Sequence, residues 1–516
     1  MNGSRGTSGA GLHFRHPHLA VVLGGGFTGM LAAAALSEHA DVVVVERERL
    51  PRTPALPTDL PQARHAQLLA SDGARIIESL LPGTVERWLA AGARHVPLPP
   101  GLAGLPPQGR LRKPRERHLI ACSPDLLDRT LRQLVSGLPG VRVIDGTEAG
   151  ALTGTAEHVT GVQVRCCDTG ETYRLDADLV VDATGRNSTT PARLAALDLP
   201  AVREEAADTG VVCATRIFRA PDGQENCPVI AARADAHRPA LPGPESGHGG
   251  WELPGPGSAG IGMTATLVPI EDGRWLVTLT GAGADRPSAH ADRFVPFARR
   301  LPHSTVADLI AGAEPLSEVR LSRDTANRRR HYEHLASWPS GFVVLGGAVA
   351  AFNPDCGQGL STAAHGAAAL RDALQRRGLD DVALARGVQR SVGRIVHAPW
   401  ATATRRGLIP DPGATAGVWP SATARLARTA NRVLSTAVGA PAVRRAYAQE
   451  APPPTAPVAP VRRPTDATGL ATTSVQGPSS PLPRSRTESR RLPRPLVFGP
   501  TALRRLGNYG RRKPTG

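Results

Sequence analysis

Residues 19–46 read LAVVLGGGFTGMLAAAALSEHADVVVVE, and this stretch decides the fold. Leu19–Leu23 is a short apolar run that predicts a buried strand, and the glycine turn Gly24–Gly29 follows it. Met30–His39 is rich in alanine, which favours a helix, and Asp41–Val45 is a β-branched run followed by an acid. Strand, glycine turn, helix, strand and acid within about 30 residues form the unit that binds dinucleotides.

Each glycine of this turn has an expected role. Gly24 permits the tight turn, Gly26 lets the backbone approach a pyrophosphate, and Gly29 lets the helix pack closely on the strand. The free amides at the start of the helix face the phosphates. Glu46 lies 20 residues after Gly26, where a carboxylate accepts hydrogen bonds from ribose hydroxyls.

Two later segments repeat the pattern of an apolar strand that runs into a glycine turn. The first is Asp178–Asp182, whose turn contains Gly185. The second is Gly341–Leu345, followed by Gly346-Gly347. We expect the three strands to lie in one parallel sheet whose carboxyl edge holds a single extended ligand.

The last unit leads into a further glycine turn. The chain runs through Pro354 to Gly357-Gln358-Gly359, and an alanine-rich segment from about Leu360 to Arg376 predicts a helix. A helix that opens at this turn would point its amides and its positive dipole end at a ligand.

Between Val202 and about Pro315 the pattern changes to strands separated by loops, of which Val211–Ile217 and Arg274–Leu279 are the clearest. The sequence therefore predicts an α/β fold: a Rossmann-like domain with an inserted, mainly antiparallel β substrate domain, a helical C-terminal region and a disordered basic tail. The expected parts are a flexible N-terminus (1–17), the Rossmann-like domain (18–201 and 316–400), the β domain (202–315), the helical region (401–450) and the tail (451–516).

Composition limits the function. The chain has 516 residues and a net charge of +16, of which the tail from Ala451 contributes +10. That tail has no basic and aromatic alternation, so we expect no nucleic-acid partner. No apolar run reaches the ~20 residues of a membrane helix, and the six cysteines form no CxxC pair. These features favour a cytoplasmic protein without a transmembrane segment or a metal site.

In their order and separations, the three strand and turn units resemble the flavin monooxygenases related to para-hydroxybenzoate hydroxylase. Further segments resemble those of the actinobacterial polyether epoxidases, a group that includes the enzyme acting on the premonensin polyene. These segments are PQARHAQLL at 61–69, DGARIIE at 72–78, LPG at 81–83, FNP at 352–354, GQG at 357–359, NRR at 327–329 and HAPW at 397–400.

The resemblance implies FAD as cofactor, NAD(P)H as reductant, and O₂ and a hydrophobic polyene of polyketide type as substrates. Oxygen would pass to the substrate from a C4a-hydroperoxide of the flavin. The implied cofactor-binding residues are Gly24, Gly26, Gly29, Glu46, Arg64, Asp182, Gly185, Gly347, Pro354, Gly357, Gln358 and Gly359. The resemblance puts Arg64 and His65 beside the flavin, although His65 also fits an ordinary capping or surface histidine and Arg64 a surface cation.

The sequence departs from the family pattern at three positions. Gly347 stands where the family has an Asp that binds the ribityl chain, Pro124 replaces an Arg, and Cys356 replaces a Tyr. Because Asp would restore the hydrogen bond to the ribityl chain that the family pattern implies, we expect Gly347→Asp to tighten FAD binding. Three readings stay open: a polyene epoxidase, an aromatic hydroxylase on the same scaffold, and an accessory homologue with weakened FAD binding. Epoxidation needs no protein base, whereas phenol hydroxylation needs one.

Overall fold

The computed structural model describes residues 15–50, 68–97, 118–225, 227–233, 262–354 and 357–405. Arg64, His65, Cys356, the first 14 residues and everything after Arg405 lie outside the described residues. The expectations for the N-terminus, for the helical region beyond Arg405 and for the tail therefore stay predictions.

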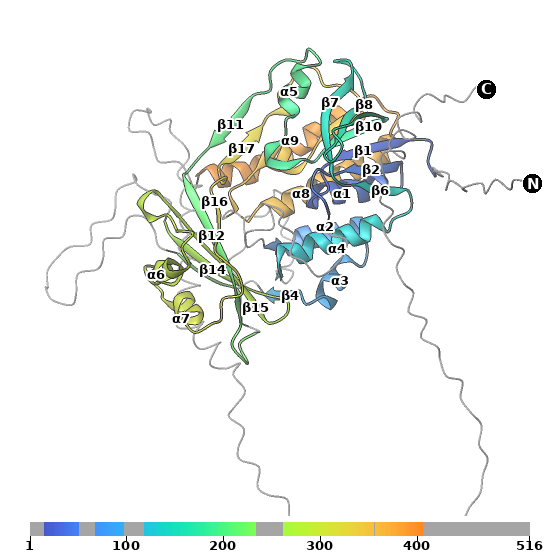
Figure 1. The fold of residues 1–516 in the computed structure, drawn as a ribbon. Coiled ribbons are helices and arrows are strands. Elements are labelled where there is room, and N and C mark those ends of the chain that lie inside the picture. Colours follow the sequence, from blue (N-terminus) through green and yellow to red (C-terminus); the bar gives the residue numbers. More distant parts are fainter. Residues whose placement is uncertain are drawn as a thin grey trace, which may run out of the picture. The chain divides into compact units, whose positions relative to one another are not determined.

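A parallel sheet forms the centre of the part that is expected to bind a dinucleotide (Figure 1). Its strand order is β18-β10-β1-β2-β6, with β18 (Phe342–Val344), β10 (Leu179–Asp182), β1 (Leu19–Leu23), β2 (Asp41–Val45) and β6 (Val141–Ile144). Every neighbouring pair is parallel, and all five residues of β1 and of β2 are buried. The three predicted strands are thus neighbours in one sheet, as expected.

The register aligns the carboxyl ends of these strands. Leu23 is opposite Val45 on one side and Asp182 on the other, and Asp182 is opposite Val344. The chain extends from β1 to β2 and β6 in one direction, whereas β10 and β18 lie on the other side of β1. The point where the order reverses therefore lies between β1 and β10, the place where open α/β sheets bind their ligands.

Helix α1 (Phe27–Leu36) is apolar around its whole circumference, and each of its residues except Thr28 is buried. This pattern is typical of a helix enclosed on all sides. It belongs to the large core that also includes the central strands and residues of α8 (Gly359–Arg377) and α9 (Leu384–Arg405). The other helices of this part are α2 (Ser71–Leu80), α3 (Thr84–Ala90), α4 (Pro124–Ser136) and α5 (Thr190–Ala195).

Three small antiparallel sheets join this part. They are β7 (Thr147–Gly154) with β8 (Val159–Cys166) and β9 (Thr172–Asp176), β3 (Leu69–Ala70) with β5 (His118–Ala121) and β4 (Arg94–Pro97), and β11 (Glu204–Ala207) with β17 (Asn327–Arg330) and β19 (Ala350–Ala351). The last of these brings residue 204 beside residue 330.

The inserted region forms a five-stranded antiparallel sheet, as the sequence predicts. Its order is β13 (Ile230–Arg233), β14 (Thr264–Ile270), β15 (Arg274–Ala282), β12 (Val211–Arg219) and β16 (Arg320–Ser322). One face packs on α6 (Phe294–Arg299) and α7 (Thr305–Ala311) through a second core that includes Trp275. Pairing crosses the predicted domain boundaries, because β16 lies beyond residue 315 and β11 belongs to another sheet.

None of the helices in the described ranges combines the length and the apolar character that crossing a bilayer requires.

Candidate functional site

The first glycine turn has the geometry that its sequence predicts. Gly24 has φ +97, a value that disfavours any side chain, and a Cβ there would lie 2.7 Å from the carbonyl oxygen of Ala183. A Cβ on Gly29 would overlap the carbonyl oxygen of Gly24, so this glycine lets the helix pack on the turn. Gly26 is the N-cap of α1 at φ −79 and ψ −173, an ordinary extended conformation. Only Gly24 of these three is a glycine because of its φ.

Glu46 directly follows β2 and lies beside this turn. Its Oε2 accepts a hydrogen bond from the amide of Gly25 at 2.6 Å, and its Oε1 accepts one from the amide of Glu48 at 2.9 Å. The side chain is half-buried. The carboxylate thus stands at the carboxyl end of the sheet, next to the start of α1, where a ribose was predicted.

The three glycine turns meet at the carboxyl edge of the sheet. The first touches the second where Gly24 faces the carbonyl of Ala183. The third turn contacts the first turn through Gly346, which has φ +58 and packs against Thr28 of α1. The third turn also contacts the second turn, because Gly347 lies against Gly185. Segments more than 150 residues apart in the chain therefore build one surface.

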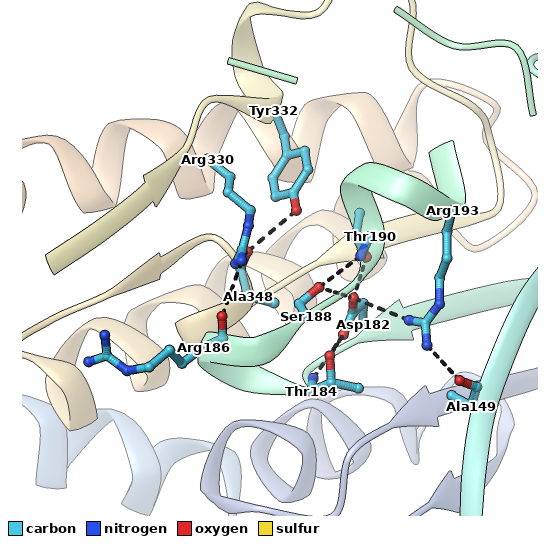
Figure 2. A network of polar contacts seen from close by, with 10 residues as sticks. All are labelled: Ala149, Asp182, Thr184, Arg186, Ser188, Thr190, Arg193, Arg330, Tyr332 and Ala348. Atoms are coloured by element: carbon cyan, nitrogen blue, oxygen red, sulfur yellow. Dashed lines mark hydrogen bonds and ion pairs between the residues drawn. The ribbon is translucent and has the colours of Figure 1, made fainter. Parts of the chain in front are cut away.

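Asp182 lies at the centre of the polar network that holds the second turn (Figure 2). The residue is fully buried. Its Oδ1 accepts from the amide and hydroxyl of Thr184 at 2.8 and 2.6 Å, and its Oδ2 accepts from Ser188 Oγ at 2.6 Å and from the hydroxyl of Thr190. Arg193 Nη1 lies 3.6 Å from the same oxygen and is nearly buried too. The carboxylate is thus occupied by the chain itself, and it shapes the turn without lining its surface.

Arg330 ties the second and third turns together. This buried guanidinium donates from Nη2 to the carbonyl of Arg186 at 3.1 Å and from Nη1 to the carbonyl of Ala348 at 3.0 Å. These acceptors lie in the 3-10 helices η2 (Gly185–Asn187) and η6 (Gly346–Ala348). In Figure 2 its neighbour Tyr332 also points at Ala348, and burial raises the pKa of that phenol. One cation therefore fixes the spacing of two turns.

Arg186 reaches from the second turn toward the segment before α8. Its Nη2 donates to the carbonyl of Phe352 at 2.9 Å, and its Nη1 donates to the carbonyl of Ala326. Asn327 completes this link by accepting from the amide of Asn353 at 2.7 Å through Oδ1. The stretch that ends at Pro354 is thus held by side chains from two other segments.

The turn before α8 leaves the start of that helix open. Gly357 has φ +62, its amide donates to the carbonyl of Pro354 at 3.2 Å, and Gln358 is the N-cap of α8. A Cβ built on Gly357 or on Gly359 would meet no described atom within 4 Å. Because α8 has 19 residues, its first amides present a substantial positive dipole end to this space.

Two of the three departures from the family pattern have a structural account. Pro124 is the first residue of α4, where its missing amide hydrogen costs nothing, and Ser123 caps that helix by accepting from the amide of Leu126 at 3.1 Å. Gly347 lies against backbone: a Cβ there would be 3.2 Å from Gly185 Cα and 3.3 Å from the Arg186 amide nitrogen. The gain in FAD binding expected from Gly347→Asp would therefore be opposed by the cost of moving these neighbours.

Sequence reasoning did not single out Arg330, Arg193 and Thr190, which hold the turns in place. Their residue types carry no periodic signal, and arginine is common throughout the chain. A usable signal was the Asn327–Arg330 run, which the resemblance included in part. The ligand contacts predicted for the cofactor-binding residues stay predictions, and the role expected for the fully buried Asp182 is an indirect one through the shape of its turn.

Comparison with known proteins identifies the family. Residues 19–377 match the model of a family described as FAD binding domain. "Protein Rv3254" of Mycobacterium tuberculosis is 31% identical over 372 residues, which cover 69% of this chain and 73% of that protein.

Solved structures share the fold. PqsL, a probable FAD-dependent monooxygenase from Pseudomonas aeruginosa, is 19% identical with a TM-score of 0.53, over 75% of this chain and 94% of PqsL. The p-nitrophenol 4-monooxygenase PnpA from Pseudomonas putida is 16% identical with a TM-score of 0.53, over 84% of this chain and 96% of PnpA. With its glycine turns, its sheet order and these matches, the chain belongs to the FAD binding domain family.

Proposed function

We propose that the protein is an FAD-dependent monooxygenase that uses NAD(P)H and O₂ to epoxidise an apolar polyene. The convergence of three glycine turns with the open start of α8 carries the proposal, because it provides one continuous surface for an extended dinucleotide. The fold alone does not fix the chemistry, which depends on the residues at the site.

The residues present fit an FAD. Glu46 offers a carboxylate beside the first turn, and Gly357 and Gly359 leave space that side chains would fill. Glu46 would accept from the ribose of the ADP half, and the amides at the start of α1 would bind the pyrophosphate. Gly185, Gly347 and Pro354 would line the path toward the flavin, with Asp182 behind them. Bound FAD supplies the electron transfer and the activation of oxygen.

The helix α8 would supply electrostatic stabilisation. Its amides at the Gly357–Gly359 turn would face negative charge that develops on the ring system, and a helix N-terminus carries roughly +0.5 of an elementary charge. These dipoles are fixed before the reaction by the hydrogen bond from Gly357 to Pro354 and by the links from Arg186 and Asn327. No rearrangement of the chain is then needed as charge forms.

The large antiparallel sheet favours a neutral, apolar substrate. Strand register places five cross-strand rows of residues on the face of β12, β14 and β15 that points away from α6 and α7, and the row at one end contains Arg219, Ile270 and Arg274. The three inner rows contain nine residues. They are Cys213, Thr215, Ile217, Thr264, Thr266, Val268, Leu276, Thr278 and Thr280. None is an acid or a histidine, and the threonines are partly satisfied by one another, as between Thr215 and Thr278 at 3.0 Å.

This face suits an alkene better than a phenol. A double bond is itself the nucleophile toward an electrophilic oxygen, whereas a phenol reacts well only after a base removes its proton. The nine side chains offer no such base. Three of them, Ile217, Val268 and Leu276, pack in an apolar cluster with Ile270 and with Ala121 of β5.

The experiment has two steps. The purified protein is first examined for flavin absorption, and NADH or NADPH oxidation is then followed with a panel of polyenes and a matched panel of phenols. Products are identified by mass spectrometry and NMR. We expect bound flavin and epoxides from polyenes. Hydroxylated phenols without epoxides would establish the hydroxylase instead, and a colourless protein that rejects added FAD would overturn both enzyme assignments.

A further inference from the structure

A cavity lies away from the predicted flavin surface. It measures about 660 Å³ and is bordered by the last turn of α8, the middle of α9 and the 3-10 helix η5 (Tyr332–His334). Five arginines line it: Arg329, Arg376, Arg377, Arg390 and Arg394. Glu333 is the one acid among its lining residues, so the lining has a net charge of +4 when its histidines are neutral. We call this cavity the basic pocket.

The positive charge of the basic pocket is poorly compensated. Arg377 pairs with Asp381 at 2.9 Å, and Arg394 donates to Ser391 Oγ at 3.0 Å. Arg390 and Arg376 form no ion pair with any residue that the structure describes. Because Arg390 and Arg394 are one helical turn apart, their charges repel on the same face of α9.

A buried arginine, Arg329, has an unpaired nitrogen at the basic pocket. Arg329 is 5% exposed, and its Nη2 donates to Glu333 Oε1 at 2.6 Å. Its Nε is buried and has no hydrogen-bond partner among the described residues. Buried donors are nearly always satisfied in folded proteins, so an unpaired guanidinium nitrogen in a residue that lines a cavity points to an acceptor from outside the described residues.

Ordinary structural roles account for only part of this cluster. Arg376 and Arg377 lie in the last turn of α8, where the helix dipole favours cations. Arg390 and Arg394 lie inside α9, and Arg329 lies on β17, so the dipole of α8 does not explain them. The sequence beyond Arg405 contributes four acids in 111 residues, which makes it a poor source of the missing negative charge.

A metal ion fits this place less well than an anion. His331, Glu333 and His334 bring possible ligand atoms within 4.8 Å of one another. However, Arg329 already pairs with Glu333 Oε1, and burial together with that guanidinium lowers the pKa of His331. The same positive field would repel a divalent cation.

The basic pocket is separate from the flavin surface. The flavin turn lies at the start of α8, and Arg376 lies 17 residues along the same helix, which corresponds to about 25 Å at 1.5 Å per residue. A ligand in the pocket is therefore too far away to exchange a hydride with a flavin at the Gly357–Gly359 turn, since reacting atoms must approach within about 3.5 Å.

We propose that the basic pocket binds a small soluble molecule that carries two or more phosphate groups. Guanidinium groups pair with phosphate through two parallel hydrogen bonds, and several of them from α8, α9 and β17 converge on one cavity. The volume lies within the range of small-molecule sites. Its lining comes from several separate elements around one hollow, which favours a small molecule over a flat membrane surface.

Inorganic tripolyphosphate is the probe. It is titrated into the full-length, flavin-loaded protein by calorimetry at constant ionic strength, so that the cofactor's own phosphate site is filled. The test variant is Arg390→Gln with Arg394→Gln. The control is Arg293→Gln with Arg299→Gln, which removes the same charge from exposed positions near and on α6. Thermal unfolding checks that both variants are folded.

We expect one binding site per chain, with affinity reduced at least tenfold in the test variant and unchanged in the control. Each charge-assisted hydrogen bond lost accounts for about a tenfold change or more. Absence of binding to the wild type, or equal losses in the two variants, would overturn the proposal. Binding to phosphatidylglycerol vesicles that depends on Arg390 and Arg394, without binding of tripolyphosphate, would overturn it in favour of a lipid headgroup.

Discussion

Replacement of Asp182 by Asn tests whether one buried carboxylate holds the second turn. The carboxylate accepts four hydrogen bonds, two from Thr184 and one each from Ser188 and Thr190, and Arg193 lies 3.6 Å away. Asn keeps the shape but turns one acceptor into a donor and removes the charge. Arg193 Nη1 is buried without a hydrogen-bond partner, so the ion pair is its compensation among the described residues.

The expected loss in the free energy of unfolding follows from these contacts. Breaking a buried ion pair by removing one partner costs about 3–5 kcal/mol, and hydrogen bonds to a charged acceptor are worth about 1.5–3 kcal/mol each before neighbours relax. Because the hydroxyls of Ser188 and Thr190 can rotate to act as acceptors, we expect the free energy of unfolding to fall by about 3 kcal/mol. We also expect flavin content to fall, since the turn loses its shape.

Asp178→Asn is the matched control. Asp178 lies four residues earlier, its side chain is half exposed, and it accepts from the amide of Leu19 at 2.8 Å. Asn can still accept that hydrogen bond, so the free energy of unfolding should change by less than about 1 kcal/mol. Urea unfolding followed by circular dichroism measures both variants. If Asp182→Asn is as stable as Asp178→Asn, the network does not stabilise the fold.

Three further predictions use other positions. Gly26→Val should abolish flavin binding without unfolding the protein, because φ −79 at this position suits any residue. Gly24→Val should instead lower the melting temperature, because φ +97 at this position disfavours a side chain. Flavin absorbance and thermal scans distinguish the two variants. Burial raises the pKa of Asp128 to about 6, above its value of 3.8 when unfolded, so the wild type loses stability as pH rises from about 4 to 6. Asp128→Asn should therefore become more stable than the wild type by about 1–3 kcal/mol at pH 7.5, with little difference at pH 4 in urea titrations. Gly347→Asp should weaken FAD binding by about 5- to 150-fold, since overpacking costs about 1–3 kcal/mol; fluorescence quenching measures it, and tighter binding would show that the neighbouring backbone yields.

The sequence predicted the parts of the fold that depend on local patterns. The first strand, glycine turn and helix were predictable because Gly24 and Gly29 have roles that only glycine fulfils. The long α8 helix was predictable within a residue or so at each end from its alanine content. The antiparallel character of the inserted sheet was predictable too, from Val211–Ile217 and Arg274–Leu279.

Long-range partners could not be read from the sequence. Arg330 acts on backbone carbonyls of residues 186 and 348, and no spacing along the chain announces such contacts. The pairing of β16 with β12 could not be predicted either, because a three-residue strand has no detectable alternation. Gly347 shows a further limit: the family pattern suggested room for Asp, but the room depends on how closely Gly185 approaches.

The order of strands in the central sheet has a consequence for synthesis. Strand β18 pairs with β10 although about 160 residues separate them, and the turn at Gly357–Gly359 comes later still. A ribosome that adds about 5–20 residues per second needs about 20–70 s to produce the first 360 residues. Throughout that time the nascent chain has its first glycine turn but lacks the edge strand and the α8 turn. The surface that we propose binds flavin therefore assembles only after most of the chain has been made.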